Sequence, residues 1–168
     1  MFNRERTTRF LLRRPAGLES RTTRAAVLAL AGIGAAFLIW SAVIHLELWG
    51  DGYRDISVIG PLFLVQGIAS IILGVAIVAF RWLALLAAGA VAGVATAVGL
   101  LLSVYVGLFG YTESLTVPYA TLSLAVEFTA ACVLLAAVGL LALGRTRPRT
   151  GRAEAGVPEA EWLRALGR

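Results

Sequence analysis

Four long apolar segments restrict this chain to very few folds. They cover residues 25–48, 56–79, 82–109 and 117–143, and almost no charge interrupts them. Each segment is longer than the roughly 20 residues that a helix needs to cross the hydrocarbon core of a bilayer. Because lipid cannot hydrogen-bond to an exposed backbone, such segments have to be helical. The sequence therefore predicts an all-α protein, a membrane four-helix bundle.

The charged residues are segregated in a way that fits this fold. Charged residues make up 15% of the 168-residue chain, whereas soluble domains carry about 25%. Seven arginines lie in residues 1–24 and four lie in residues 145–152. We therefore expect three parts: an arginine-rich tail (1–24), a transmembrane domain (25–144) and a second tail (145–168). The second tail can form a short amphipathic helix after Pro158.

The arginines also predict how the chain is oriented. Both tails and Arg81 fall on one side of the membrane, and the opposite loops contain a single basic residue, Arg54. Cytoplasmic segments carry the excess of Lys and Arg. We expect both termini to be cytoplasmic and the protein to be a multi-pass protein of a cell membrane, a bacterial plasma membrane. Phe10, Leu11 and Leu12 form an apolar patch with which the first tail can rest on the membrane surface.

Composition excludes several functions. The net charge of +5 does not indicate nucleic-acid binding, because the arginines flank apolar segments instead of covering a polar domain. Membrane lipid is the expected partner of such flanks. One cysteine, Cys132, and one histidine, His45, are too few for a disulfide or for a typical metal site within one chain. We expect no metal and no cofactor.

Polar and aromatic residues concentrate where the first span ends. Ser41, His45 and Trp49 are four residues apart and share one helix face. One interpretation is an outward-facing polar site in which His45 carries a proton or contacts a ligand. The other is an anchor at the membrane interface, where aromatic residues gather. The same stretch continues with Glu47, Tyr53 and Arg54.

Glu127 lies inside the fourth span, where a carboxylate is costly. A charge at the centre of a transmembrane helix costs about 2.5–3.5 kcal/mol on insertion scales. We expect its side chain to face the bundle interior, with Gln66, Ser103 and Tyr105 as candidate partners. It can serve as a proton, cation or ligand site, or as a neutral group that ties helices together. We also hypothesise that His45 and Glu127 share one pocket.

Small residues recur at helical spacing in two spans. Gly60, Gly67 and Gly74 repeat every seven residues, and Gly89, Gly93 and Ala97 every four. Such stripes allow helices to approach closely in lipid. We interpret them as packing surfaces within one bundle, with contacts between copies of the chain as the alternative.

One stretch resembles a known pattern. It consists of HLELW at 45–49, GYRDI at 52–56 and IGPLFLVQ at 59–66. Together with the four-span layout, it is similar to small integral membrane proteins of actinobacteria, a family without an assigned function. The resemblance implies that the first outer loop and the start of the second span act as a unit with His45. It implies no activity.

The sequence thus favours a membrane protein without catalytic activity that holds a small ligand or proton in an outward-facing pocket. The candidate residues are His45, Glu47, Tyr53, Arg54, Gln66 and Glu127. Two alternatives stay open. The first is a structural or assembly subunit of a larger membrane complex, with a homo-oligomer or another membrane protein as its partner. The second is an enzyme that acts on a lipid or quinone with His45 and a glutamate as acid and base.

Overall fold

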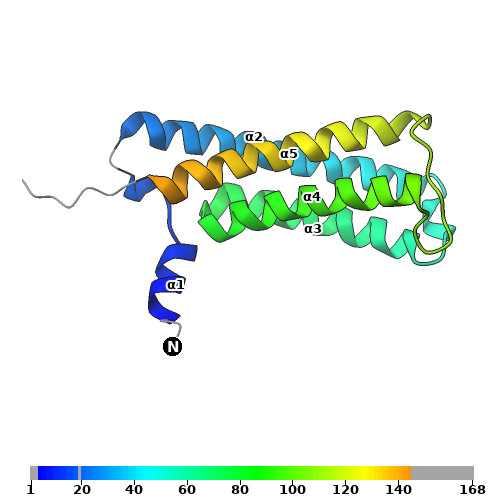
Figure 1. Cartoon of the computed structure of the whole chain (residues 1–168), viewed down its shortest axis with the longest axis horizontal. Coiled ribbons are helices and arrows are strands. Elements are labelled where there is room, and N and C mark those ends of the chain that lie inside the picture. Colours follow the sequence, from blue (N-terminus) through cyan, green and yellow to red (C-terminus); the bar gives the residue numbers. More distant parts are fainter. Residues whose placement is uncertain (1–3, 19, 145–168) are drawn as a thin grey trace, which may run out of the picture.

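A computed structural model of the chain describes residues 4–18 and 20–144 and is helical throughout most of that length. Figure 1 shows a short helix, α1 (Arg4–Leu11), followed by four long helices: α2 (Arg21–Gly50), α3 (Ile59–Phe80), α4 (Leu83–Tyr105) and α5 (Pro118–Leu143). All four are long and apolar enough to cross a membrane. The predicted all-α four-helix bundle is confirmed. The predicted helix after Pro158 lies outside the described residues.

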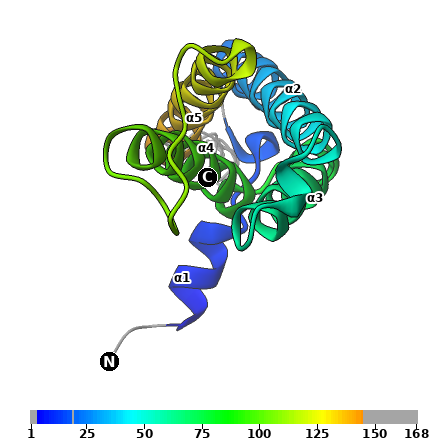
Figure 2. The same ribbon diagram turned by 90° about the vertical axis from the view of Figure 1, so that its right-hand side faces the viewer.

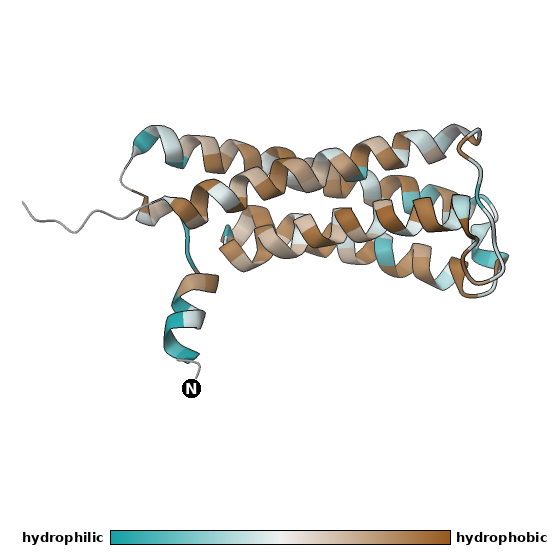
Figure 3. Cartoon of the chain, in the orientation of Figure 1, coloured by the Kyte–Doolittle hydropathy of each residue, from teal (hydrophilic) through white to brown (hydrophobic). Residues whose placement is uncertain are grey.

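The long helices form an antiparallel ring. Viewed from one end, the order around the ring is α3, α2, α5 and α4 (Figure 2). α2 packs extensively on α3 and on α5, and α5 on α4, whereas α3 contacts α4 much less. Large buried side chains such as Leu38, Leu86 and Leu134 fill the centre. Hydrophobic residues cover the length of the bundle and polar residues gather near its ends (Figure 3).

Helix boundaries follow local chemistry. Ser20 caps α2 by accepting a hydrogen bond from the backbone N–H of Thr23, at 3.3 Å. The third predicted span reaches residue 109, but α4 ends at Tyr105. The chain turns there because Gly107 and Gly110 adopt positive φ angles of 84° and 79°.

The glycine stripes pack inside the bundle. A β-carbon on Gly60 would lie 2.6 Å from the carbonyl oxygen of Arg54, so this glycine lets the loop between α2 and α3 fold onto α3. Gly67 and Gly74 face α2, and Gly89 and Gly93 face α5 or the centre. These small residues set the close helix approaches, as expected for packing in lipid.

Residues 13–18 form part of the bundle, although the sequence suggests a tail that ends at residue 24. The Arg13 guanidinium donates to the carbonyl oxygens of Ala142, at 3.0 Å, and of Gly144. The Arg13 carbonyl accepts from the N–H of Leu83, at 3.0 Å. Leu18 is buried in the main core. The segment thus satisfies backbone groups at the ends of α4 and α5, where helices lack internal partners. α1 projects away from this end with Phe10, Leu11 and Leu12 exposed (Figure 1).

Candidate functional site

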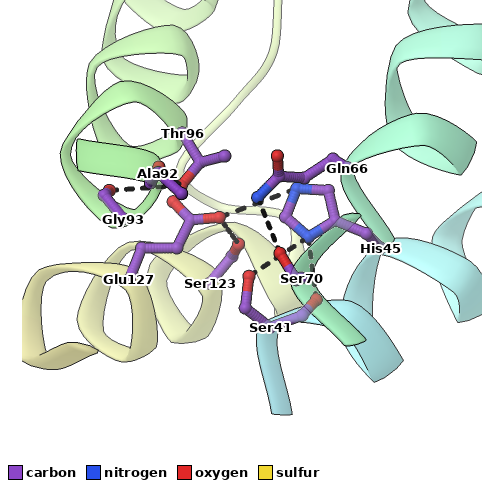
Figure 4. A network of polar contacts seen from close by, with 9 residues as sticks. All are labelled: Ser41, His45, Gln66, Ser70, Ala92, Gly93, Thr96, Ser123 and Glu127. Atoms are coloured by element: carbon purple, nitrogen blue, oxygen red, sulfur yellow. Dashed lines mark hydrogen bonds and ion pairs between the residues drawn. The ribbon is translucent and has the colours of Figure 1, made fainter. Parts of the chain in front are cut away.

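A histidine and a glutamate meet inside the bundle. Nε2 of His45, on α2, lies 3.6 Å from Oε1 of Glu127, on α5. Glu127 is only 2% exposed and His45 only 8%. Figure 4 shows the two side chains pointing toward one another from neighbouring helices. The sequence suggests that these two residues share one pocket, and the structure places them in contact.

The histidine ring is oriented by its own helix. Nδ1 lies 2.8 Å from the carbonyl oxygen of Ser41, one turn earlier, and 3.5 Å from the Ser41 hydroxyl. A carbonyl oxygen can only accept, so Nδ1 carries a proton. Nε2 is then an acceptor in neutral histidine and a donor in the protonated form. Its glutamate neighbour can supply or receive that proton, so the pair can hold one proton and carry no net charge.

The carboxyl group of Glu127 is only partly satisfied. Ser123, one turn earlier on α5, donates its hydroxyl to Oε1 at 3.0 Å. Oε2 is buried and has no hydrogen-bond partner among the residues that the structure describes. Thr96 of α4 lies beside the carboxyl group, but its hydroxyl is directed to the carbonyl oxygens of Ala92 and Gly93 (Figure 4). A buried polar atom without a partner is costly, so a neutral carboxyl group suits this position better than a carboxylate.

An open pocket of about 190 Å³ lies between α3 and α4 and borders His45. It lies where these helices separate toward the loop end of the bundle, and its walls are mostly apolar. The polar residues that line it are His45, Gln66, Ser103, Tyr111 and Glu113. A smaller cavity of about 40 Å³ also borders His45 and reaches Ser123. Glu127 does not line either cavity, so His45 separates the carboxyl group from the pocket.

An aromatic cluster with one carboxylate lies at the loop end of the pocket and the adjoining cavity. Tyr53 and Tyr111 donate their hydroxyls to Oε2 of Glu113, at 2.7 and 3.2 Å. The ring of Phe63 stacks on Tyr53 at 4.8 Å and lies 5.0 Å from the ring of His45. Burial raises the pKa of Tyr53, and the bonds to Tyr111 and Glu113 raise it further. The Tyr53 hydroxyl therefore stays protonated and remains a hydrogen-bond donor at any physiological pH.

The remaining site residues and partners that the sequence suggested do not contact Glu127. Gln66 lines the pocket, but its amide donates to Ser70, at 3.1 Å, instead of to Glu127. Ser103 contacts the carbonyl oxygen of Tyr111, and Tyr105 is 75% exposed, so neither is the partner of Glu127 that we expected.

Glu47 is exposed on α2, away from the pair. Arg54 is exposed next to Asp55, 3.9 Å away. Among the candidates, His45, Gln66 and Tyr53 border the pocket system and Glu127 lies behind it.

Sequence reasoning missed several members of the site. Ser123 precedes Glu127 by one helical turn, and the same spacing relates Ser41 to His45, so spacing alone could have found Ser123. Thr96 lies on another helix and gives no such signal. Glu113 and Tyr111 lie in a loop, and their meeting with Tyr53 depends on the fold.

Comparison with known proteins assigns this chain to no family. The chain matches no protein-family model, no curated protein and no solved structure. The four long apolar helices are compatible with an integral membrane protein and suggest several membrane crossings.

Proposed function

We propose that this chain is an integral membrane protein that binds a small, neutral, lipid-soluble ligand in the pocket between α3 and α4. The observation that carries the proposal is the placement of the His45–Glu127 pair directly behind an apolar pocket that is open between two helices. Ligand sites in proteins combine mostly apolar walls with a few placed polar groups. Here His45 and Gln66 supply polar groups at the wall, and Phe63 and Leu100 supply apolar surface.

The charge of the pocket restricts its ligand. Glu113 lines the pocket and its carboxylate accepts three hydrogen bonds, from Tyr53, Tyr111 and the N–H of Ser114. A fixed negative charge at the pocket disfavours an anionic group nearby. The shared proton keeps the His45–Glu127 pair neutral. A quinone or a lipid alcohol, which exchanges hydrogen bonds without carrying charge, has the chemistry that fits.

The geometry of the pair supports binding of a neutral ligand more than catalysis. An enzyme acting on a lipid or quinone would need a histidine nitrogen directed at its substrate. Nδ1 of His45 is held by the Ser41 carbonyl, and Nε2 faces Glu127 at 3.6 Å, so neither nitrogen is directed at the pocket. The subunit alternative loses part of its support, because the glycine stripes face other helices of the same bundle.

Filling the pocket is expected to abolish ligand binding. Gly99 lines the pocket, and a β-carbon there would meet nothing within 4 Å, so Gly99→Phe can occupy the cavity without a clash. Gly139→Phe on α5 is the matched control, since its β-carbon is equally free. We expect decyl-ubiquinone, or a neutral lipid that co-purifies in mild detergent, to bind the unmodified chain and the Gly139 variant. Native mass spectrometry of the Gly99 variant should show no such ligand.

Equal ligand occupancy in both glycine variants would refute the pocket as the binding site. A chain that purifies without any neutral ligand and does not bind decyl-ubiquinone would refute the proposed function as a whole. Circular dichroism of both variants establishes that the helices are intact.

Orientation in the membrane is a further part of this proposal. We place the arginine-rich end, which holds α1, Arg81 and the end of α5, in the cytoplasm of a bacterial cell, and the pocket near the outer face. The support is the distribution of arginines and the fact that these segments lie at one end of the bundle (Figure 1). Fusions of alkaline phosphatase should be inactive at either terminus and active in the loop at residues 112–116. Activity at a terminus would reverse the orientation.

A further inference from the structure

At the opposite end of the bundle, three arginines surround a second pocket. Arg14, Arg24 and Arg81 line a cavity of about 210 Å³, together with the apolar side chains of Leu28 and Phe80. They come from three segments: the stretch before α2, the first turns of α2 and the turn between α3 and α4. None of the three forms a salt bridge with a carboxylate in the described part of the chain. The pocket therefore concentrates positive charge that the described residues do not neutralise.

An apolar groove continues from this cavity along the bundle. It has a volume of about 290 Å³ between α2 and α3 and is lined by Leu28, Ala31, Gly32, Ile77, Val78 and Arg81. Leu28 and Arg81 line both spaces, so the cavity and the groove adjoin. Leu28 and Val78 are exposed on the surface that faces lipid. Positive charge at the end of an apolar groove matches a molecule with an anionic head and a hydrocarbon chain.

The backbone at Arg81 is unusual for its residue type. Arg81 ends α3 in the left-handed conformation, with φ of 55° and ψ of 34°. Glycine adopts this conformation without steric cost and is the common residue at this place after a helix. An arginine there is less favourable for the fold, and strained positions of this kind often occur at ligand sites. Arg14 is also fixed in place, because its guanidinium stacks over the ring of Trp82 at 5.5 Å.

We propose that this arginine cavity and the adjoining α2–α3 groove bind one anionic phospholipid, with its phosphate between Arg24 and Arg81 and an acyl chain against Gly32. Guanidinium groups suit phosphate because their N–H groups form paired, charge-assisted hydrogen bonds. Basic pockets between transmembrane helices at the cytoplasmic side bind lipid head groups in this way. Because this site lies at the opposite end of the bundle from the α3–α4 pocket, either proposal can fail without the other.

The test measures lipid binding to the full-length chain. The protein in dodecyl maltoside is titrated with dioleoyl phosphatidylglycerol or dioleoyl phosphatidylcholine and analysed by native mass spectrometry. These lipids have the same acyl chains, so a difference reports on the head group. We expect about tenfold tighter binding of phosphatidylglycerol, because the cationic choline of phosphatidylcholine is repelled by the three arginines whereas the net negative charge of phosphatidylglycerol is not. Equal binding of the two lipids would overturn the proposal.

Arg81→Gly separates binding from folding. Glycine relieves the left-handed backbone and removes the guanidinium, so we expect equal or higher thermal stability together with loss of the preference for phosphatidylglycerol. Arg54→Gln at the opposite end is the charge-matched control, because its side chain is 57% exposed and lies away from the cavity. A stable Arg81 variant that keeps the preference would overturn the proposal, as would an equal loss in the Arg54 variant.

Gly32→Leu tests the acyl chain. Its β-carbon would meet nothing within 4 Å, so a leucine can fill the groove without a clash. We expect weaker binding of phosphatidylglycerol, whereas Gly139→Leu should bind it like the unmodified chain. Glycerol 3-phosphate, which has the anionic head without the chain, should not displace the lipid. Displacement by glycerol 3-phosphate, with no effect of Gly32→Leu, would show a site for soluble anions and overturn the proposal.

Discussion

Glu127→Ala is expected to lower the free energy of unfolding by about 3 kcal/mol, because it removes one partner of a buried pair and leaves a cavity. The truncation removes the acceptor of the Ser123 hydroxyl and the group that faces Nε2 of His45. Glu127 is only 2% exposed, so the space that its side chain leaves is buried. The measurement is unfolding in mixed micelles of increasing sodium dodecyl sulfate content, followed by circular dichroism.

Two further variants are controls for the Glu127→Ala measurement. Glu47→Ala removes an exposed carboxylate near the C-terminal end of α2 and should change the free energy of unfolding by less than about 0.5 kcal/mol. Glu127→Gln keeps a polar group of the same shape, so most of the stability should return, but the amide cannot exchange a proton with His45. A Glu127→Ala variant as stable as the Glu47 variant would show that the pair contributes nothing to the fold.

Gly93→Leu is expected to cost about 3 kcal/mol or to prevent folding, because α4 and α5 are in backbone contact there. A β-carbon on Gly93 would lie 2.9 Å from the carbonyl oxygen of Glu127 and 3.2 Å from the backbone nitrogen of Ala131. Backbone atoms in a packed helix cannot rotate away as a side chain can. The helices would have to separate at the level of Glu127, so we expect ligand binding to be lost as well.

Gly99→Leu provides the control within the same helix. Both positions lie on α4, but a β-carbon on Gly99 meets nothing within 4 Å. Replacing glycine in a helix by a better helix former should leave the free energy of unfolding equal or slightly higher. The same titration with sodium dodecyl sulfate measures both variants. Similar stability of the two would mean that α4 and α5 do not approach at Gly93 as the structure shows.

The helical bundle was predictable because each long segment has to be helical for a reason that lies within that segment. Each long apolar segment must satisfy its backbone hydrogen bonds within itself in lipid, and only a helix does so. The glycines of α3 were predictable as packing positions for a similar reason, since their spacing places them on one face. The end of α4 was less predictable, because Leu108 and Phe109 are apolar but follow the turn at Gly107.

The partners of buried polar groups were less predictable because the helices are apolar on almost every side. A soluble helix shows its buried face as an apolar stripe, but α3 and α5 have no polar face to contrast with it. Depth along the helix could be estimated from sequence, and it suggested Gln66 for Glu127. The rotation of α2 and α5 turns His45 toward Glu127, whereas Gln66 bonds to Ser70, one turn later on its own helix.

The sequence alone therefore predicted a membrane environment, the number of long helices and the cost of leaving Glu127 unpaired. The tertiary structure decided which groups meet: the His45–Glu127 pair, the tyrosines around Glu113, and the arginines around one cavity. The physical reason is that hydrophobicity acts on each segment separately, whereas a site depends on the register and rotation of several helices at once. Close packing of small residues fixes both.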